Sequence, residues 1–563
     1  GSNVTGITNS SSTGYQYYAQ RYSMTDDFPF AEINVFQLGL YAQDKWTVSD
    51  KLNLTLGLRI DVPFFMTDLQ SNDKVAAETY RDGIKIDVSK YPNAKPQFSP
   101  RFGFNYKPFD DENGSLQIRG GTGLFTGTPP YVWISNQAGN NGVLFGDLNV
   151  RAVKDKNDNI ISDGRPSLGF TGNMDTYKPA EGSATRSDIA ITDPDFKYPS
   201  LWKSNIAADY KFGDGWVATV ELLYSKDINA IYHDNIGLYR TEQFVNDGGA
   251  GNARPYYNGY YSDREGNQKA ANHVVMLRNT SKGHSLYTTF QLQKNFVDGI
   301  LKGLYLNGSY SFGQSRGVTD GTSSVATSAW KYRAALDGNA EEVGYTAGSF
   351  DGRLLLSASY TANWSKYAAT SFGLIYQRYR PFRYSYCYNG DANGDSQFSN
   401  DLMYIPANFD EVKDHLLPGD FDSQEDAWKA MNAFIEQDPY LSKHRGEYAE
   451  RNGAVAPFAN QLDLSVSHDI KIYQKNGRSH TLRFSFNIAN FLNLLNRNWG
   501  VVQTTVLGNQ QYQFLTIPKG QGPSAANNYT LKYTMAKDLD ETFKDNLNDV
   551  SRWQMQFGIK YIF

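Results

Sequence analysis

The sequence lacks several features that define common protein classes. Its 563 residues include one cysteine, Cys387, so no intramolecular disulfide and no metal site of paired cysteines can form. No run of about 18 apolar residues occurs, which excludes a transmembrane helix. Lys and Arg total 54 against 59 Asp and Glu, a net charge of −5. Without a basic excess or a polybasic run, nucleic acid is not an expected partner.

Motifs for catalysis are missing as well. The seven histidines show no metal-ligand spacing, and no nucleophile elbow or paired-carboxylate motif can be placed. We therefore expect that the protein is not an enzyme. A barrel-embedded hydrolase is the alternative, which a mutational scan of interior serines and histidines would reveal.

The clearest feature present is strict alternation of apolar and polar residues. From Leu52 to Val62 every even position is apolar and every odd position is polar or glycine, and similar patterns occur at 354–360, 482–489 and 553–563. A mean hydropathy of −0.55 is compatible with a membrane location, because only alternate residues of a barrel strand meet lipid. Aromatic residues reach 14%, as aromatic girdles at membrane interfaces require. The pattern predicts an all-β fold, a transmembrane antiparallel β-barrel.

Thirteen strands are predicted, separated alternately by short turns and long polar segments. They are expected at 36–48, 51–64, 97–107, 115–126, 200–212, 216–228, 284–296, 303–313, 350–364, 367–382, 458–473, 479–492 and 552–563. The short connections are rich in Gly, Asp, Asn and Ser, as hairpins require. Barrels of this class keep short turns in the periplasm and long loops outside, so the C-terminus at Phe563 is expected in the periplasm.

An odd number of strands is unusual, since single-chain bacterial barrels have even numbers and close fully. An open edge in lipid would leave backbone groups without partners. We therefore interpret the chain as the later part of a larger barrel. Residues 1–35 are expected to be an extracellular loop segment and 36–563 the barrel portion.

Six segments follow one another along nearly the whole chain. They are LYAQDKW at 40–46, LTLGLRID at 54–61, SPRFGFNY at 99–106, PYVWISNQ at 130–137, YLSKHRGEY at 440–448, and NFLN at 490–493 before WG at 499–500. Together they resemble the C-terminal barrel portion of TonB-dependent outer-membrane receptors, especially the Oar-like group. The resemblance implies the last 13 or so of about 22 strands around a plug, in the outer membrane of a Gram-negative bacterium. The plug, the TonB box, a carboxypeptidase-regulatory-like domain and about nine strands have no counterpart in this sequence.

The resemblance implies part of an active transporter that binds a large ligand with its exterior loops and lumen. Oligopeptide or protein is the preferred ligand class, and protein export is an alternative direction. Expected partners are a chain or segment that carries the plug and first strands, the TonB complex through that plug, outer-membrane lipid and an extracellular lipoprotein. Alternatives are a passive channel or surface-display scaffold without energised transport, and a soluble β-rich glycan-binding protein.

Two groups of residues are candidates for contact with a ligand or plug. Loop aromatics can stack on a ligand: Tyr131, Trp133, Tyr256, Tyr257, Tyr260 and Tyr261. Charged residues mainly on the polar strand face are expected to line the lumen or face the plug: Arg59, Arg101, Arg119, Glu221 and Arg483. Solvated interior charge is the alternative for each of the second group.

One long segment contains a candidate calcium loop. Asp391, Asn393 and Asp395 place oxygen ligands at every second residue, with Asp401 after them. The pattern departs from a standard calcium loop because Ser396 replaces the expected glycine and Leu402 the final carboxylate. The alternative is a solvated acidic loop.

The same long segment predicts a helix over 422–439. Ser423 and Asp426 form a capping pattern, and Trp428, Met431 and Ile435 follow at helical spacing. Such a helix could cover the pore, or it could pack onto the barrel rim or a neighbouring protein.

Overall fold

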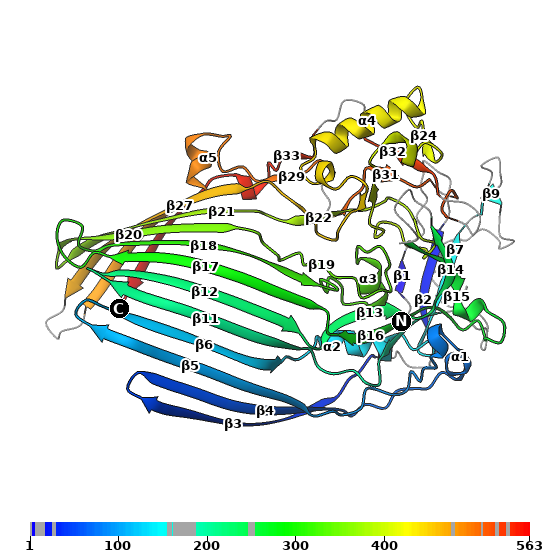
Figure 1. Cartoon of the computed structure of the whole chain (residues 1–563), viewed down its shortest axis with the longest axis horizontal. Coiled ribbons are helices and arrows are strands. Elements are labelled where there is room, and N and C mark those ends of the chain that lie inside the picture. Colours follow the sequence, from blue (N-terminus) through cyan, green and yellow to red (C-terminus); the bar gives the residue numbers. More distant parts are fainter. Residues whose placement is uncertain are drawn as a thin grey trace.

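The computed structural model describes residues 3–5, 17–24, 30–151, 153–154, 160–161, 187–245, 254–473, 479–507, 511–518, 520–523, 529–535 and 541–563. A long antiparallel sheet occupies one part of the molecule, and its connecting segments gather at one end (Figure 1). Among the described helices, none has the length and apolar character needed to span a membrane.

The main sheet follows a path of thirteen strands in sequence order, each antiparallel to the next. They are β3 (Val35–Ser49), β4 (Leu52–Phe65), β5 (Gln97–Asp111), β6 (Gly114–Thr126), β11 (Ser200–Phe212), β12 (Trp216–Asp227), β17 (Gly283–Asn295), β18 (Leu304–Gly317), β20 (Arg353–Ser365), β21 (Ala368–Tyr379), β27 (Ala459–Tyr473), β28 (Ser479–Ala489) and β34 (Gln554–Ile562). A short strand, β19 (Gly344–Tyr345), pairs with β18 beside this path. Each predicted range overlaps one strand of the path, so the predicted strand positions are confirmed.

Two neighbouring rows across the sheet show how the alternation separates its faces. One row follows the paired residues Tyr106, Ile118, Ala208, Val220, Phe290, Tyr310 and Leu354. The next row follows Asn105, Arg119, Ala207, Glu221, Thr289, Ser311 and Arg353. The first is entirely apolar or aromatic, and the second is polar at every position but one. We assign the first face to lipid and the second to the barrel interior.

Adjacent residues of β17 test this assignment. Phe290 lies near the middle of the strand and is 47% exposed, whereas Gln291 points to the polar face and donates to Asn307 Oδ1 at 2.7 Å. Phe290→Arg is expected to cost about 2–4 kcal/mol, because it places a charge in the hydrocarbon layer. Gln291→Arg is expected to assemble normally. The measurement is the folded fraction on unheated SDS gels of outer membranes. If the folded band were lost in Gln291→Arg and retained in Phe290→Arg, the assignment of the two faces would have to be reversed.

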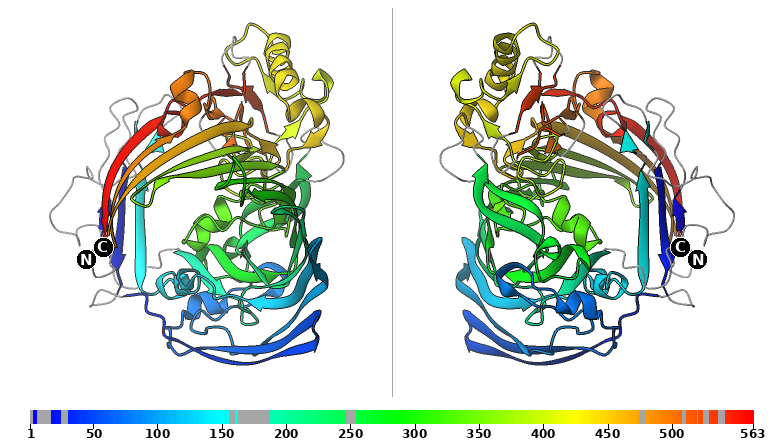
Figure 2. Two further views of the ribbon diagram at one scale, coloured as in Figure 1. Left: turned by 90° about the vertical axis from the view of Figure 1, so that its left-hand side faces the viewer. Right: turned by 90° about the vertical axis from the view of Figure 1, so that its right-hand side faces the viewer.

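The sheet curves into an incomplete cylinder (Figure 2). Over the described residues, β3 pairs only with β4, and β34 pairs only with β28. A small sheet of β1 (Asn3–Thr5), β2 (Tyr17–Ser23) and β7 (Phe145–Arg151) stands near the open side at the loop end. The short turns and the C-terminus lie toward the opposite end (Figure 1). The turn expected at 474–478 is outside the described residues.

The six long connections form what we call the loop body: the described residues of 66–96, 127–199, 228–282, 318–352, 380–458 and 490–553. Its further strands are β8 (Val153–Lys154), β9 (Ile160–Ile161), β10 (Ser187–Thr192), β13 (Ala230–Asn235), β14 (Leu238–Val245), β15 (Arg254–Tyr260), β16 (Ala271–Thr280), β22 (Arg383–Tyr386), β23 (Tyr404–Ile405), β24 (Leu416–Leu417), β25 (Glu447–Tyr448), β26 (Ala454–Val455), β29 (Gln503–Thr505), β30 (Gln511–Tyr512), β31 (Leu515–Thr516), β32 (Leu531–Tyr533) and β33 (Phe543–Asp545). Its helices are α1 (Asp73–Ala77), α2 (Tyr131–Gly139), α3 (Ala326–Lys331), α4 (Gln424–Gln437) and α5 (Phe491–Leu495), with single 3₁₀ turns at Arg81–Gly83, Tyr261–Asp263, Phe409–Glu411, Leu441–Lys443 and Asp549–Ser551.

The main hydrophobic cores lie in the loop body, which corrects the expectation of merely long polar loops. The largest cluster joins residues of 384–454 to residues of 512–535 and includes Tyr386, Phe434 and Tyr512. A second cluster joins α1 to β10 and β16. Burial of these apolar side chains supplies the stabilisation that orders the loops. This end of the molecule is therefore a packed structure.

Helix α4 confirms the helix predicted over 422–439 within two residues at each end. The Ser423 side chain accepts from the amide of Asp426 at 3.1 Å, as expected for an N-cap. Met431, Phe434 and Ile435 are buried in the largest cluster of the loop body. Its apolar stripe therefore packs on the chain's own loops.

Candidate functional site

Ion pairs between neighbouring strands dominate the polar face of the sheet. Arg119 Nε donates to Asp209 at 2.9 Å, and Arg119 Nη1 lies 3.8 Å from Glu221 Oε1. Asp209 also accepts from the Thr219 hydroxyl at 2.7 Å. Hydrogen bonds within the sheet thus hold these charges in place, and the charge of Arg119 is compensated at this part of the wall.

The remaining predicted lumen residues are placed in similar ways. Arg59 pairs with Asp61 at 2.7 Å, and Arg483 pairs with Asp469 at 2.6 Å. Arg101 has no ion pair within the described part of the chain, and its guanidinium lies 4.7 Å from the centre of the Phe125 ring. Contact of any of these residues with a plug or solute stays a prediction.

The predicted ligand-binding aromatics lie in the loop body, where they contact other parts of the chain. Tyr256 and Tyr257 are buried, and the Tyr257 hydroxyl donates to Asp337 at 2.7 Å. Tyr131 and Tyr198 share a hydrogen bond of 3.1 Å, and Trp133 Nε1 donates to the Ser323 carbonyl at 2.8 Å.

Tyr260 packs edge-on against His273, and Tyr261 packs edge-on against Tyr239. All six aromatics thus have a visible structural role. Stacking on a ligand stays a prediction for them, and in this structure other residues of the chain enclose the Tyr256 and Tyr257 rings.

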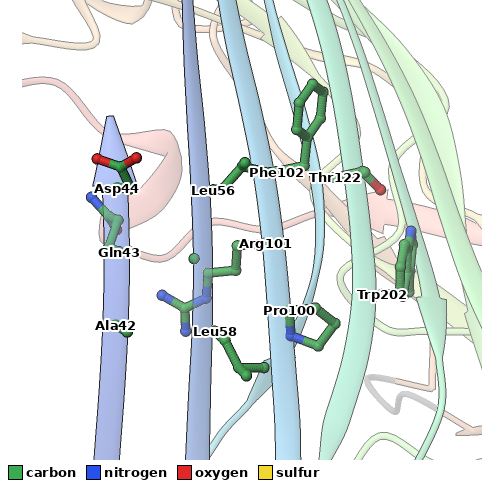
Figure 3. Close-up of a pocket in the computed structure, with 11 residues that line it drawn as sticks. Ala42, Gln43, Asp44, Leu56, Leu58, Pro100, Arg101, Phe102, Thr122 and Trp202 are labelled. Carbon is green, nitrogen blue, oxygen red and sulfur yellow. The ribbon is translucent and has the colours of Figure 1, made fainter. Parts of the chain in front are cut away.

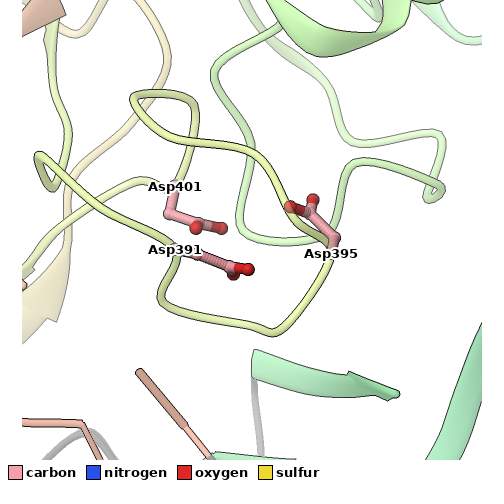
Figure 4. A group of neighbouring side chains, drawn as sticks. All are labelled: Asp391, Asp395 and Asp401. Carbon is pink, nitrogen blue, oxygen red and sulfur yellow. The ribbon is translucent and has the colours of Figure 1, made fainter. Parts of the chain in front are cut away.

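The candidate calcium loop folds so that its acidic side chains converge (Figure 4). Carboxylate oxygens of Asp391, Asp395 and Asp401 all lie within 4.8 Å of one another. Asn393, Asp395 and Asp401 have no exposed surface. The Asp401 carboxylate accepts from the Ala392 amide at 2.8 Å and pairs at 3.2 Å with the fully buried Arg254 of β15.

Burial and mutual repulsion make these carboxylates reluctant to ionise. Burial, with repulsion from Asp391, raises the pKa of Asp395 to about 7. Burial also raises the pKa of Asp391, although hydrogen bonds from backbone amides oppose this. For Asp401, burial and the charge of Asp395 raise the pKa, and Arg254 opposes them.

A second buried titratable group lies nearby in the loop body. His273 in β16 accepts through Nδ1 from Asn235 Nδ2 at 2.7 Å, because the Asn235 oxygen already accepts from the Val274 and Gly237 amides. Burial lowers the pKa of His273 to about 4, with Asp188 raising it and Lys331 lowering it further. The folded state therefore holds this imidazole neutral.

This predicts that acid weakens the packing of β16 around His273. Below about pH 6.5 the unfolded chain binds a proton that the folded chain excludes until about pH 4, so stability is full above this window and falls as the pH is lowered. At pH 5 the loss is about 2 kcal/mol. Hydrogen exchange in β16, corrected for intrinsic rates, should therefore be faster at pH 5 than at pH 7.5. In the variant His273→Gln, the corrected exchange rate of β16 should depend less on pH. A corrected exchange rate that does not change with pH in the unmodified protein would contradict the prediction.

Two cavities of similar size differ in their surroundings. One, of about 580 Å³, is an open depression over β3 to β6 and β11 that includes Leu58, Phe102 and Trp202 (Figure 3). These residues share the apolar face, so this depression faces lipid by our assignment. The other, of about 630 Å³, lies in the loop body and includes Lys331 and Gln513.

The sequence did not single out this loop-body cavity, because its lining comes from segments far apart in the chain. Its polar lining includes Lys331, Arg333, Gln397, Asn452, Gln511 and Gln513. Arg333 is largely occupied by backbone carbonyls, including that of Ala340 at 2.9 Å. The Asn452 amide nitrogen already donates to Asp320 and to the Tyr345 carbonyl. The Gln511 and Gln513 amides and Lys331 remain the groups best suited to meet a bound molecule.

A curved antiparallel sheet with one apolar and one polar face defines a membrane-spanning β-barrel protein. A family model described as an outer membrane beta barrel domain matches residues 8–524, which is most of the chain. The chain belongs to this outer-membrane β-barrel family, and the outer membrane is its location.

Solved structures of two receptors and a transporter are similar to the chain at low identity. A ferric enterobactin receptor mutant from Pseudomonas aeruginosa is 9% identical, with a TM-score of 0.38 over 97% of this chain and 50% of that one. The siderophore receptor PirA from Acinetobacter baumannii is 8% identical, with a TM-score of 0.38 over 85% and 47%. The FrpB iron transporter from Neisseria meningitidis is 11% identical, with a TM-score of 0.36 over 85% and 48%. The chain spans about half the length of these proteins. No curated protein matches it.

Proposed function

We propose that this chain is the C-terminal part of a TonB-dependent outer-membrane transporter of the Oar-like group. The observation that carries the proposal is the thirteen-stranded sheet with a polar inner face and two unpaired edges, over the described residues. Because unpaired strand edges are not stable in lipid, further strands must complete the wall. A barrel wider than eight strands encloses a lumen, and barrels of about 22 strands hold a plug.

The packed loop body supports transport of a selected ligand over free diffusion. It gathers at one end of the sheet and contains the largest hydrophobic cluster of the described chain. A rigid exterior structure can bind a ligand before the plug admits it. We assign this end to the exterior and the end with the short turns to the periplasm, together with the C-terminus.

Oligopeptide or protein is the ligand class we propose. The loop-body cavity has the size of a typical ligand site. Its Gln511 and Gln513 side chains can both donate to and accept from peptide groups, and Lys331 can pair with a carboxylate. The proposed partners are the plug-bearing segment or chain, the TonB complex and an extracellular lipoprotein.

Uptake of labelled casein peptides by whole cells tests the proposal. Uptake should require this protein and TonB, and it should stop when a protonophore collapses the proton gradient. Native mass spectrometry of the unheated complex should show a plug-bearing segment, either in the same polypeptide or in a second one. Uptake that persists without TonB would instead identify a passive channel. A protein that is present at the cell surface but supports no uptake would be a surface-display scaffold.

A matched pair of loop-body variants tests the cavity. Lys331→Glu is expected to reduce peptide uptake about tenfold, since it replaces a charge-assisted hydrogen bond by repulsion of the peptide carboxylate. Lys413→Glu makes the same charge change at an exposed position outside the cavity lining and should leave uptake unchanged. Equal uptake by both variants would exclude the cavity as the peptide site.

A further inference from the structure

The acidic cluster of the loop body carries more negative charge than its surroundings neutralise. Asp391, Asp395 and Asp401 bring three carboxylates together, and the ion pair between Arg254 and Asp401 supplies one positive charge. Asp395 and Asp401 have no exposed surface, so water cannot solvate their charge freely. A cation bound among the carboxylates would compensate it.

A neighbouring amide provides an independent sign of a missing ligand. Asn400 is 3% exposed, and its Oδ1 has no hydrogen-bond partner in the described chain. The Asn400 side chain hydrogen-bonds to Asp395, which places its amide group at the carboxylate cluster. Ionised carboxylates are acceptors only and cannot satisfy this oxygen, whereas a cation, which also favours their ionised form, can.

We propose that Asp391, Asn393, Asp395, Asn400 and Asp401 form a calcium-binding site that fastens the loop body together. Carboxylate and amide oxygens are the ligands that Ca²⁺ prefers, and six to eight or so are common around it. Mg²⁺ is less suited, because it retains several water molecules and requires a stricter octahedral geometry. The proposal is independent of the transported ligand.

The structure also accounts for both departures from a standard calcium loop. Ser396 adopts φ +66°, the left-handed conformation that glycine usually provides at this position. The carboxylate that is absent at Leu402 is replaced by that of Asp401, because Asp401 folds back onto the Ala392 amide. The loop therefore supplies the closing carboxylate one residue early.

A bound ion would order a loop that contacts two other long connections. The Asn393 carbonyl accepts from the Tyr257 amide at 2.8 Å, which links the site to β15. Arg254 of the same strand pairs with Asp401, and the Ala335 amide donates to the Asn400 carbonyl at 2.9 Å. Calcium thus stabilises contacts among segments that the sequence separates widely.

Metal analysis of the intact complex tests the site. The complex is purified in detergent, dialysed against metal-free buffer, and its calcium measured by mass spectrometry. The variant Asp391→Asn/Asp395→Asn should lose one calcium equivalent relative to the unmodified protein. The control Asp414→Asn/Asp422→Asn makes the same charge change at exposed positions of the same segment and should retain it. Calcium bound by lipopolysaccharide is common to all three preparations and cancels in the comparison.

Proteolysis keeps the test decisive if the variant folds poorly. When EGTA removes calcium from the unmodified protein, protease should cleave within 383–457 at least tenfold faster. The protein should still migrate as a folded barrel on unheated gels. Added Ca²⁺ should restore resistance and Mg²⁺ should not. Equal calcium in all three proteins, or resistance unaffected by EGTA, would overturn the proposal, and restoration by Mg²⁺ alone would overturn the assignment to calcium.

Discussion

Phe434→Ala is expected to destabilise the loop body by about 3–5 kcal/mol, because it removes a buried ring and leaves a cavity. The ring is 1% exposed and contacts Tyr512 and Phe514, with ring centres 6.0 and 5.1 Å away. These neighbours belong to a distant segment of the chain, so the cavity weakens the contact between two long connections. Hydrogen exchange of α4 should accelerate by about two to four orders of magnitude.

The matched control is Leu547→Ala, at a position that is 69% exposed in the last long connection. It removes a side chain of the loop body without creating a cavity, and exchange in α4 should not change. The sheet itself should remain resistant to SDS in both variants, because its stability comes from strand pairing and lipid. Unchanged exchange in Phe434→Ala would show that α4 is held by contacts other than this cluster.

The strands and α4 were predictable because local patterns determine them. A strand with one side to lipid must alternate residue by residue, and this alternation marks each strand without knowledge of its neighbours. The N-cap of α4 depends on Ser423 and Asp426 alone. The bounds predicted from the alternation and from the capping pattern therefore agree with those in the structure within a few residues.

The loop body was not predictable because distant segments build it. Ser385 in β22 pairs in parallel with Gln511 in β30, and Leu416 pairs in parallel with Leu531. No local pattern indicates such pairings. The burial of two predicted ligand-binding aromatics was not predictable for the same reason. In the sequence, Tyr256 and Tyr257 are consistent with an exposed binding surface, but other connections cover them in the structure.

The acidic loop combines both cases. Its alternating oxygen ligands were visible in the sequence, and the structure brings Asp391, Asp395 and Asp401 together. The role of Arg254 was not visible, because it comes from another connection. The buried Arg254 guanidinium, which comes from a distant segment, changes the charge balance of the loop. It therefore also changes how much stability a substitution at the loop will cost.

Arg254→Met is therefore expected to cost about 3–5 kcal/mol when calcium is removed with EGTA. Both Arg254 and Asp401 are fully buried, so the substitution leaves a carboxylate without its cation. Arg254 also donates to the Leu402 carbonyl, which then loses this donor. The readout is the free energy of local opening, measured by hydrogen exchange in β22.

The double variant Arg254→Met/Asp401→Asn separates charge from packing. Asparagine keeps the oxygen that accepts from the Ala392 amide but carries no charge, so the double variant should recover most of the loss. With calcium present, Arg254→Met alone should also lose less, because the ion compensates Asp401 in place of the guanidinium. The guanidinium lies 5.6 Å from the Tyr388 ring centre and 5.5 Å from that of Tyr448. Equal losses in the single and double variants, with and without calcium, would show that Arg254 acts through these rings and that its charge does not matter.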